Sequence, residues 1–281
     1  MAYKIIKKNI RNSNQQEIPL KDCSIRKFCC IGEDIYFTHE LGIGKISEGK
    51  IEKDWHLQLS YARGPDFSDF NSICYNEFQK CLMITSRDGC QIYKIDMFLL
   101  DFESIISDES RYKFKKKYVG DINSDSYIAS LGKETVWSLK DRHRCFLLDS
   151  ESARPLVGCG KSGCSTTFLK YARISQPTGI AILENSVCFA DSGNNFIKSI
   201  SGNRISNVVD DCKGLRDIHY KNQKLFFLSE NIVYMLSSEG DVTHVFEIYE
   251  EESQIVSFCP SEKSDIYILE KYSVNKAEKN S

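Results

Sequence analysis

A short apolar segment ending in a polar residue recurs along the chain at intervals of roughly 40–50 residues. A strand-like segment precedes each copy and another follows it. This period suits a unit of four short strands joined by loops of variable length. The six copies are Ile35–His39, Leu82–Ser86, Val136–Lys140, Val187–Asp191, Leu225–Ser229 and Ile266–Glu270.

The strand before each copy carries a small or polar side chain at a corresponding position. The innermost strands of a propeller crowd around a central axis, so small residues are expected there. A β-sandwich would not require one small residue per repeat. The pattern therefore predicts an all-β, six-bladed β-propeller, with one larger side chain at the axis, His219. The small or polar residues are Cys29, Cys74, Ser130, Ala181 and Ser257.

The fourth copy has turn chemistry at each corner. Strands are predicted over Gly179–Ile182, Val187–Ala190 and Phe196–Ile200, with a turn at Ser192–Asn195 in which Gly193 and the asparagines tolerate positive φ. Residues 172–200 resemble one NHL repeat, which runs Pro-x-Gly-Ile-Ala, then an apolar strand ending Ala-Asp, then Asn-Asn. The resemblance implies an NHL-type propeller in which the other five copies are degenerate.

The two ends of the chain complement each other. Too few residues follow Glu270 to complete a blade, whereas Ala2–Ile10 is strand-like and has no partner in the first blade. Pairing this segment into the last blade would close the ring and remove two exposed sheet edges. We expect one domain over residues 1–281, with an insertion at 97–120 between blades two and three. Met97–Ile106 would form a short helix or an outer strand, unless the insertion hides a seventh blade.

Composition excludes several classes of partner. The net charge of −2 and pI of about 6.3 give no general attraction to nucleic acid or to a membrane. The first residues lack the apolar core of a signal peptide, so we expect a cytoplasmic protein. The twelve cysteines form no Cys-x-x-Cys pair and mostly lie in apolar runs, which predicts buried, reduced thiols.

A glycine-rich stretch, Gly158–Gly163, has the spacing Gly-x-Gly-x-x-Gly. A dinucleotide site would need a helix opening at the last glycine, but β-branched residues and Pro177 follow instead. A phosphate loop would need a lysine where Cys164 stands. We therefore expect a flexible loop between blades and no cofactor.

The polar residues that end the six copies are candidates for one mouth of the central channel. They are His39, Ser86, Lys140, Asp191, Ser229 and Glu270. Mixed charges at short range suit ion pairs and water, and a lysine competes with a cation for carboxylates. The Asp191 carboxylate is expected to accept hydrogen bonds from the Ser192–Asn195 turn. No catalytic motif is present, and the sequence leaves a metal site open.

The sequence is compatible with two functions. The first is a non-catalytic scaffold that binds a protein partner through its irregular loops, with Lys115, Lys116, Lys117 and Lys161 as candidate contacts. The alternative is a metal-dependent hydrolase or lyase with an axial site, as in the lactonases that this architecture resembles. RNA binding, known for NHL propellers, is less favoured because one short basic run beside an acidic stretch is typical of a solvated loop.

Overall fold

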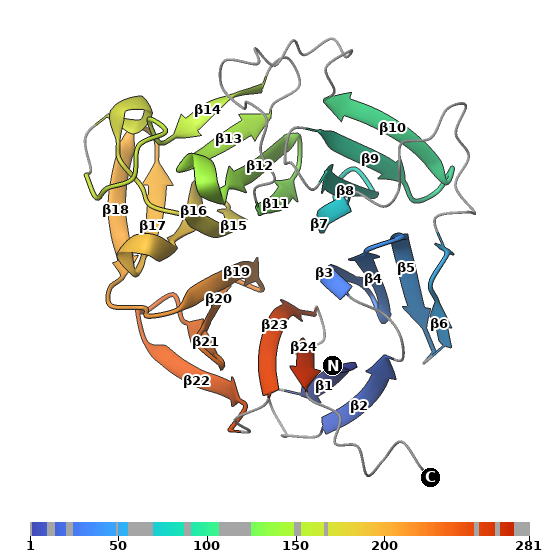
Figure 1. The fold of residues 1–281 in the computed structure, drawn as a ribbon. Coiled ribbons are helices and arrows are strands. Elements are labelled where there is room, and N and C mark those ends of the chain that lie inside the picture. The colour runs from blue at the N-terminus through green and yellow to red at the C-terminus, as the bar shows by residue number, and fades with distance from the viewer. Residues whose placement is uncertain are drawn as a thin grey trace.

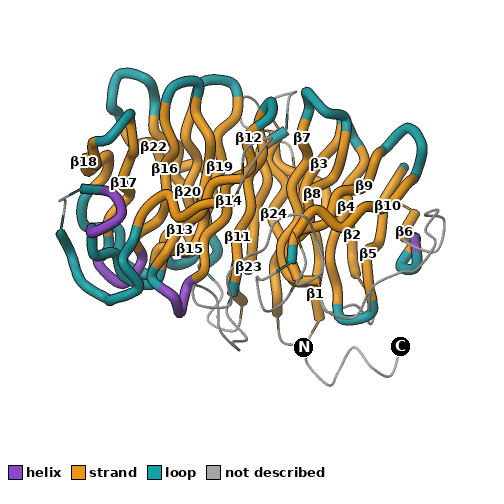
Figure 2. Tube along the Cα trace, turned by 90° about the horizontal axis from the view of Figure 1, so that it is seen from above, coloured by secondary structure: helices purple, strands orange, loops and turns teal. Residues whose placement is uncertain are grey.

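The computed structural model describes residues 2–9, 15–20, 25–48, 50–55, 70–86, 91–106, 125–148, 153–165, 168–249, 253–261 and 265–272. Six four-stranded antiparallel sheets are arranged around a central axis as the blades of a β-propeller (Figure 1). The all-β, six-bladed β-propeller predicted from the sequence is confirmed. Seen from the side, the strands run roughly along the axis of the ring (Figure 2).

We number the blades in chain order and give each from its innermost strand outward. Blade one is β3 (Ile25–Ile31), β4 (Asp34–His39), β5 (Gly42–Ser47) and β6 (Lys50–Glu52). Blade two is β7 (Phe70–Asn76), β8 (Cys81–Ser86), β9 (Ile92–Asp96) and β10 (Asp101–Ile106). Blade three is β11 (Ser126–Leu131), β12 (Glu134–Leu139), β13 (Arg144–Leu148) and β14 (Ala153–Val157).

Blade four is β15 (Pro177–Leu183), β16 (Ser186–Asp191), β17 (Phe196–Ser201) and β18 (Arg204–Val209). Blade five is β19 (Leu215–Lys221), β20 (Lys224–Ser229), β21 (Ile232–Leu236) and β22 (Val242–Glu247). Blade six combines the two ends of the described chain: β23 (Ser253–Pro260), β24 (Asp265–Tyr272), β1 (Ala2–Asn9) and β2 (Gln15–Leu20).

The hydrophobic core is divided among the boundaries between blades. Six clusters of buried apolar side chains are present, and each joins two neighbouring blades, including blade six with blade one. A second strand such as β8 is buried at every residue because other blades cover both faces of its sheet. Such a strand reads as a continuous apolar run, which is why the second strands gave the clearest repeat signal. The outer strand β18 is mostly exposed.

The ring closes where β1 pairs with β24. The ladder runs from Ala2 opposite Tyr272 to Asn9 opposite Asp265, as expected for the N-terminal strand. Ile5 and Ile6 of β1 are buried on opposite faces, against blade one and blade five respectively. β2 adds a second N-terminal strand outside β1, which the sequence pattern did not predict.

The turn after β16 shows how local sequence fixes a corner. It is a short 3-10 helix, η5 (Ser192–Asn194), followed by Asn195 with φ of 61°, as expected for an asparagine there. Gly193 has a different role from the expected one, because its φ is not positive. A Cβ at this position would lie 2.3 Å from Oγ of Ser175, so the glycine allows a close approach between segments.

Residues 97–106 of the predicted insertion belong to blade two, and residues 107–120 lie outside the described residues. Met97–Leu100 form a turn, and β10 is the regular outer strand of blade two, so the outer-strand alternative for residues 97–106 is correct. The candidate contacts Lys115, Lys116 and Lys117 lie outside the described residues. Among the helices of the described residues, none has the length and apolar character needed to cross a membrane.

Candidate functional site

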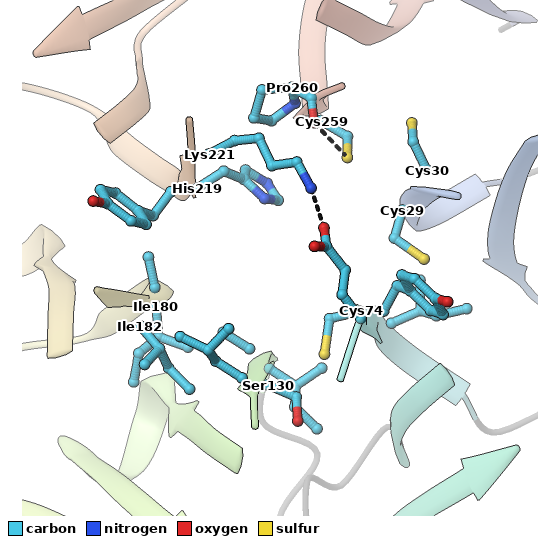
Figure 3. A pocket seen from close by; sticks show the side chains of 18 of the residues that line it. Cys29, Cys30, Cys74, Ser130, Ile180, Ile182, His219, Lys221, Cys259 and Pro260 are labelled. Carbon is cyan, nitrogen blue, oxygen red and sulfur yellow. Dashed lines mark hydrogen bonds and ion pairs between the residues drawn. The ribbon is translucent and has the colours of Figure 1, made fainter. Parts of the chain in front are cut away.

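A cavity of about 370 Å³ lies at one end of the central channel, and the innermost strands of all six blades line it (Figure 3). Its rim includes residues at or beside the turns between the first and second strands, such as Glu77, Glu184 and Asn222. Such a site at the axis combines side chains from segments far apart in the sequence. The spacing of residues in a sequence motif therefore cannot reveal this site.

One level of this cavity is a ring of six equivalent positions, one on each innermost strand. They are Cys29, Cys74, Ala129, Ala181, His219 and Cys259. Small residues predominate, as the sequence predicts, and His219 is the exception that the sequence also indicated. An imidazole where other blades carry a thiol or a methyl group is the one sequence signal for this site.

Two members of the ring differ from the prediction. In blade three, β12 ends at Leu139, which pairs with Ser126, so the ring position is Ala129 instead of Ser130. In blade six, Cys259 pairs with Tyr267 and takes the ring position instead of Ser257. Strand ends and turn lengths vary between blades, so an offset counted along the sequence misplaces the residue.

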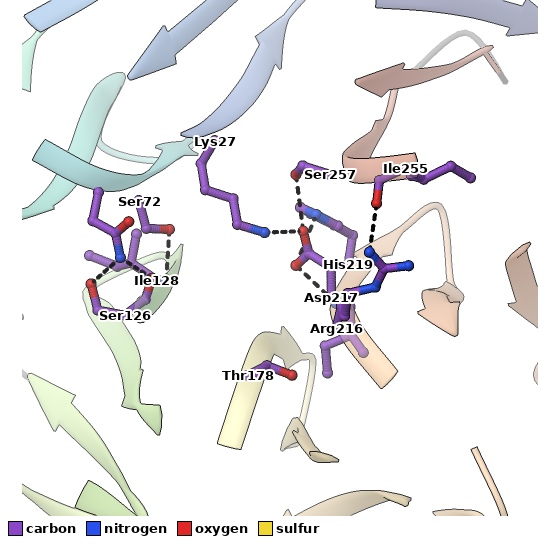
Figure 4. Close-up of polar contacts among 12 residues, drawn as sticks. Lys27, Ser72, Ser126, Ile128, Thr178, Arg216, Asp217, His219, Ile255 and Ser257 are labelled. Atoms are coloured by element: carbon purple, nitrogen blue, oxygen red, sulfur yellow. Dashed lines mark hydrogen bonds and ion pairs between the residues drawn. The ribbon is translucent and has the colours of Figure 1, made fainter. Parts of the chain in front are cut away.

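A buried ionic network lies two residues before the ring positions along the innermost strands (Figure 4). Lys27 Nζ from blade one is 2.6 Å from Oδ2 of Asp217 in blade five, and Ser257 from blade six donates a hydrogen bond of 3.0 Å to the same oxygen. Lys27 also lies 4.4 Å from the ring centroid of Tyr127 in blade three, in a cation–π contact. The network therefore joins blades one, three, five and six, whose strands belong to separate sheets.

The charges of this network shift the titration of its members in opposite directions. Burial alone would raise the pKa of Asp217, but Lys27 and His219 hold that pKa well below its usual range. Burial alone would lower the pKa of His219, but the Asp217 carboxylate, 3.6 Å from Nε2, raises that pKa. His219 thus carries more positive charge near neutral pH than a free histidine would.

Two cysteines lie on the neighbouring wall of the cavity. Cys30 of β3 and Cys259 of β23 lie at the boundary between blades one and six, and the Cys259 thiol donates a hydrogen bond of 3.7 Å to the carbonyl of Pro260. The neighbouring Cys30 thiol lowers the pKa of the Cys259 thiol to about 7 despite its burial, and the charges of His219 and Lys221 act in the same direction. Burial raises the pKa of Cys30. Lys221 in turn is paired with Glu77 across the mouth.

The six residues expected at a channel mouth do not line this cavity. They lie at or next to the ends of second strands, at the end of the blades opposite the first hairpin turns. His39 contacts the carbonyl of Lys53 in 2.9 Å, Ser86 bonds to Gln91, and Ser229 donates to the carbonyl of Lys213. These contacts stay within the neighbourhood of one blade, because a second strand is screened from the axis by the first.

The charged members of that set also have local partners. Lys140 lies 3.4 Å from Asp125, and Glu270 lies 3.4 Å from Lys4 of β1. Asp191 is fully buried with Lys198, their charged atoms 2.6 Å apart. Asp191 also accepts hydrogen bonds from the backbone N–H of Ser175 and from the side chain of Asn194. The hydrogen bond expected from the 192–195 turn is present, and these contacts of Asp191 hold the turn and the neighbouring strand together.

The glycine-rich stretch belongs to a loop that is held by several hydrogen bonds, in contrast to the flexible loop that we expected. The N–H of Cys159 donates to the carbonyl of Ala172 at 2.9 Å, and Arg144 donates to the carbonyl of Cys159 at 2.8 Å. Asn194 of blade four donates to the carbonyl of Gly163 at 2.8 Å. We call the described residues 158–165 and 168–176 the connecting loop, since they join blades three and four.

The outer surface of the connecting loop is aromatic and basic. Phe168 and Tyr171 are 76% and 62% exposed. Lys161, Lys170 and Arg173 are also exposed, and Lys170 lies over the Tyr171 ring at 4.9 Å. This surface is at the end of the blades away from the cavity, because the loop packs on the turn that follows β16.

The cysteines are mostly as expected. All ten cysteines in the described ranges are free thiols, six of them buried, and Cys164 of the connecting loop is exposed. In the part of the chain that the structure describes, no three His, Cys, Asp or Glu side chains form a group that could hold a metal ion. The metal-dependent alternative therefore has no ligand set among these residues.

The fold is similar to several solved structures. A chain of the nidogen/laminin complex is 10% identical over 88% of this chain and 94% of its own, with a TM-score of 0.61. Putative TolB from Agrobacterium tumefaciens is 12% identical over 98% and 99%, with a TM-score of 0.66. Virginiamycin B lyase from Staphylococcus aureus is 14% identical over 97% and 100%, with a TM-score of 0.54.

The sequence itself has no match that would extend this likeness. No family model matches the chain, and no curated protein matches it. Identities of 10% to 14% show a shared fold and no more. The similar structures include a protein from a protein–protein complex and a lyase, so the propeller fold alone is compatible with both kinds of function.

Proposed function

We propose that this propeller is a non-catalytic binding protein and that the connecting loop is its contact surface for a protein partner. The observation that carries the proposal is the pair of aromatic rings, Phe168 and Tyr171, exposed on a loop whose backbone is held by hydrogen bonds. A fixed loop presents these rings with little loss of conformational entropy on binding.

The composition of the surface indicates the chemistry of the partner. Aromatic and arginine side chains are enriched in protein interfaces, where they supply most of the binding energy. Lys161, Lys170 and Arg173 surround the rings with positive charge. The complementary surface is an acidic segment carrying apolar side chains, because its carboxylates pair with these cations while its apolar groups cover the rings.

The fold gives this proposal general support. The nidogen/laminin complex contains a chain of the same fold. Loops on a rigid β-scaffold are a common place for binding residues. Lys161 was a candidate contact on sequence grounds, and its exposure on this surface is consistent with that role.

Affinity capture followed by quantitative mass spectrometry tests the proposal. The protein and two double variants are used as bait in an extract of the source cells. Phe168→Ser with Tyr171→Ser alters the connecting loop. The matched control, Phe98→Ser with Leu99→Ser, alters two similarly exposed side chains on the β9–β10 turn, 88% and 65% exposed.

We expect a partner that is captured by the wild type and the control and lost from the connecting-loop variant. Lys161→Glu should weaken the same capture, and added salt should weaken it further because the contacts are partly ionic. Both double variants should melt like the wild type, since all four side chains are largely exposed. A partner retained equally by all three baits would contradict the proposal.

A further inference from the structure

Four exposed apolar side chains lie on adjacent hairpin turns at the end of the ring where the cavity opens. They are Phe78 of the β7–β8 turn, which is 71% exposed, Phe98 and Leu99 of the β9–β10 turn, and Leu131 at the β11–β12 turn, which is 45% exposed. These turns belong to the upper edge of the ring in Figure 2. We call these four side chains the apolar tips.

Hydrogen bonds hold the three turns side by side. The N–H of Met97 donates to the carbonyl of Lys80 at 3.1 Å, which joins the β9–β10 turn to the β7–β8 turn. The side chains of Asn76 and Gln79 each donate to the carbonyl of Gly132 at 2.9 Å, which joins the β7–β8 turn to the β11–β12 turn. The apolar tips are therefore neighbours on blades two and three.

The turns that carry Phe78 and Phe98 have the same construction. The side-chain oxygen of Asn76 accepts a hydrogen bond of 3.1 Å from the N–H of Phe78, and the Asp96 carboxylate accepts one of 2.9 Å from the N–H of Phe98. Each phenylalanine is the second residue after the capping side chain, and each is largely exposed. Because these turns are held in place, little conformational entropy is lost when the rings are buried by a partner.

The hairpin turns of the other blades are polar at this end of the ring. The described turns there are Gly32–Glu33, Glu184–Asn185, Gly202–Asn203, Asn222–Gln223 and Ser237–Asp241. None of these five turns carries an apolar side chain. The apolar surface is therefore specific to blades two and three and does not follow from the propeller fold itself.

The exposed area of the apolar tips favours a lipid surface over a protein partner. A fully exposed aromatic side chain presents roughly 150–250 Å², so the four tips together present on the order of 500 Å². A stable protein complex, including a pair of copies of this chain, buries about 800 Å² on each partner. Side chains that protrude from adjacent turns at one end of a molecule can instead enter a lipid layer individually, because the layer closes around each of them.

The charges on these turns complement phospholipid headgroups. Lys80 and Lys133 are exposed on the same turns as the apolar tips. Glu77 is the one acidic residue of turn residues 77–80, 97–100 and 132–133, and it is paired with Lys221. The other nearby carboxylates begin or end the flanking strands: Asp96, Asp101 and Glu134. The two lysines can therefore pair with lipid phosphates while the apolar tips are buried among the lipids.

We propose that the apolar tips form a phospholipid-binding surface, through which the protein associates peripherally with a membrane. The tips enter the boundary between headgroups and acyl chains, and Lys80 and Lys133 contact the phosphates. The attraction is local, since the charge of the whole chain favours no membrane. The proposal is independent of the proposed protein-binding function, because the connecting loop lies at the other end of the blades.

Sedimentation with extruded vesicles tests the proposal, with phosphatidylcholine and phosphatidylserine in a three-to-one ratio. We expect wild-type protein to sediment with the vesicles. Phe98→Ser with Leu99→Ser should lower the partition coefficient by about tenfold, because two apolar side chains no longer enter the lipid. Phe78→Ser should lower it from the neighbouring turn. The matched control is Phe168→Ser with Tyr171→Ser, which alters the connecting loop and should bind like the wild type.

A fluorescence measurement shows which surface enters the lipid. The two natural tryptophans, Trp55 and Trp137, are buried, so a tryptophan introduced at an exposed site reports separately. In Phe98→Trp, vesicles should shift the emission to shorter wavelength, and brominated lipid should quench it. In Phe168→Trp, the vesicles should change neither property.

Several outcomes would overturn the proposal. They are wild-type protein that does not sediment with vesicles, as expected for a surface that binds protein, equal binding by the Phe98–Leu99 double variant, and a loss of binding in the connecting-loop variant instead. The Phe98–Leu99 double variant is also the control for partner capture, so the two proposals can fail separately. Each variant is first compared with the wild type by thermal denaturation, and we expect no change because the altered side chains are largely exposed.

Discussion

The contribution of β1 to the stability of the closed ring can be measured by replacing a single side chain. Ile5 is fully buried and packs with Leu20, Phe28 and Tyr267 at the boundary between blades six and one. Replacing an isoleucine by alanine in such a site costs about 2–5 kcal/mol, from lost transfer free energy and from the cavity that remains. That is a large part of the roughly 5–15 kcal/mol that stabilises a typical domain.

Urea denaturation followed by far-UV circular dichroism measures this loss. Ile84→Ala is the reference, because Ile84 is equally buried in blade two, well inside the chain. We expect Ile5→Ala to lower the free energy of unfolding by as much as Ile84→Ala. The negative control is Gln16→Ala, an exposed side chain of β2, which should change stability by less than about 0.5 kcal/mol.

One result of these measurements would contradict the prediction. If Ile5→Ala behaves like Gln16→Ala, the N-terminal strand does not contribute to the folded ring in solution, and the closure argument is wrong. Deleting residues 1–10 extends the test. It removes β1 and exposes the edge of β24, so we expect a loss of several kcal/mol and a tendency to aggregate through the free edge.

Three further predictions concern buried groups. Asp191→Ala should destabilise the fold by about 3–5 kcal/mol, because Lys198 would remain buried without its partner, and urea midpoints would show it. Because the pKa of Asp217 is lowered in the folded protein, its contribution to stability is complete above the ordinary aspartate pKa of about 4 and is lost as pH falls further. Because the pKa of His219 is raised, its contribution to stability is complete below about pH 6.5 and is lost as pH rises through the folded value. Stability profiles of Asp217→Asn and His219→Gln should lack the acid and the alkaline loss respectively, and unchanged profiles would contradict this. Gly179→Ala should cost about 1–3 kcal/mol by thermal denaturation, because its Cβ would lie 2.3 Å from the backbone nitrogen of Ile218 in blade five.

The sequence was sufficient for the architecture because a propeller repeats one pattern. The second strands are covered on both faces, so each reads as an apolar run, and the copies share a period. The degenerate blades could be placed by this period alone, without the local NHL-like pattern of residues 172–200. The same reasoning failed by one residue in blade three, where β12 ends at Leu139 and Lys140 already begins the short helix η3 (Lys140–Arg142).

The candidate site was much less predictable. Residues that end second strands looked like an axial set, but the first strand of each blade lies between them and the axis, so Asp191 and Glu270 found local partners. The groups that do meet at the axis, such as Lys27 and Asp217, are far apart in the sequence. Only His219 stood out in advance, as a large residue at a position that is otherwise small.

The way the last blade is assembled has a consequence for synthesis of the protein. The strand β1 ends at Asn9, but its partner β24 begins at Asp265, so most of the chain must be translated between the two. At a typical rate of about 5–20 residues per second, this takes roughly 10–50 seconds. During that time β1 has emerged from the ribosome without its partner, and Ile5 and Ile6 have no completed blade to pack against. Nascent chains of this protein should therefore be clients of chaperones that bind apolar N-terminal segments, until the last two strands are released.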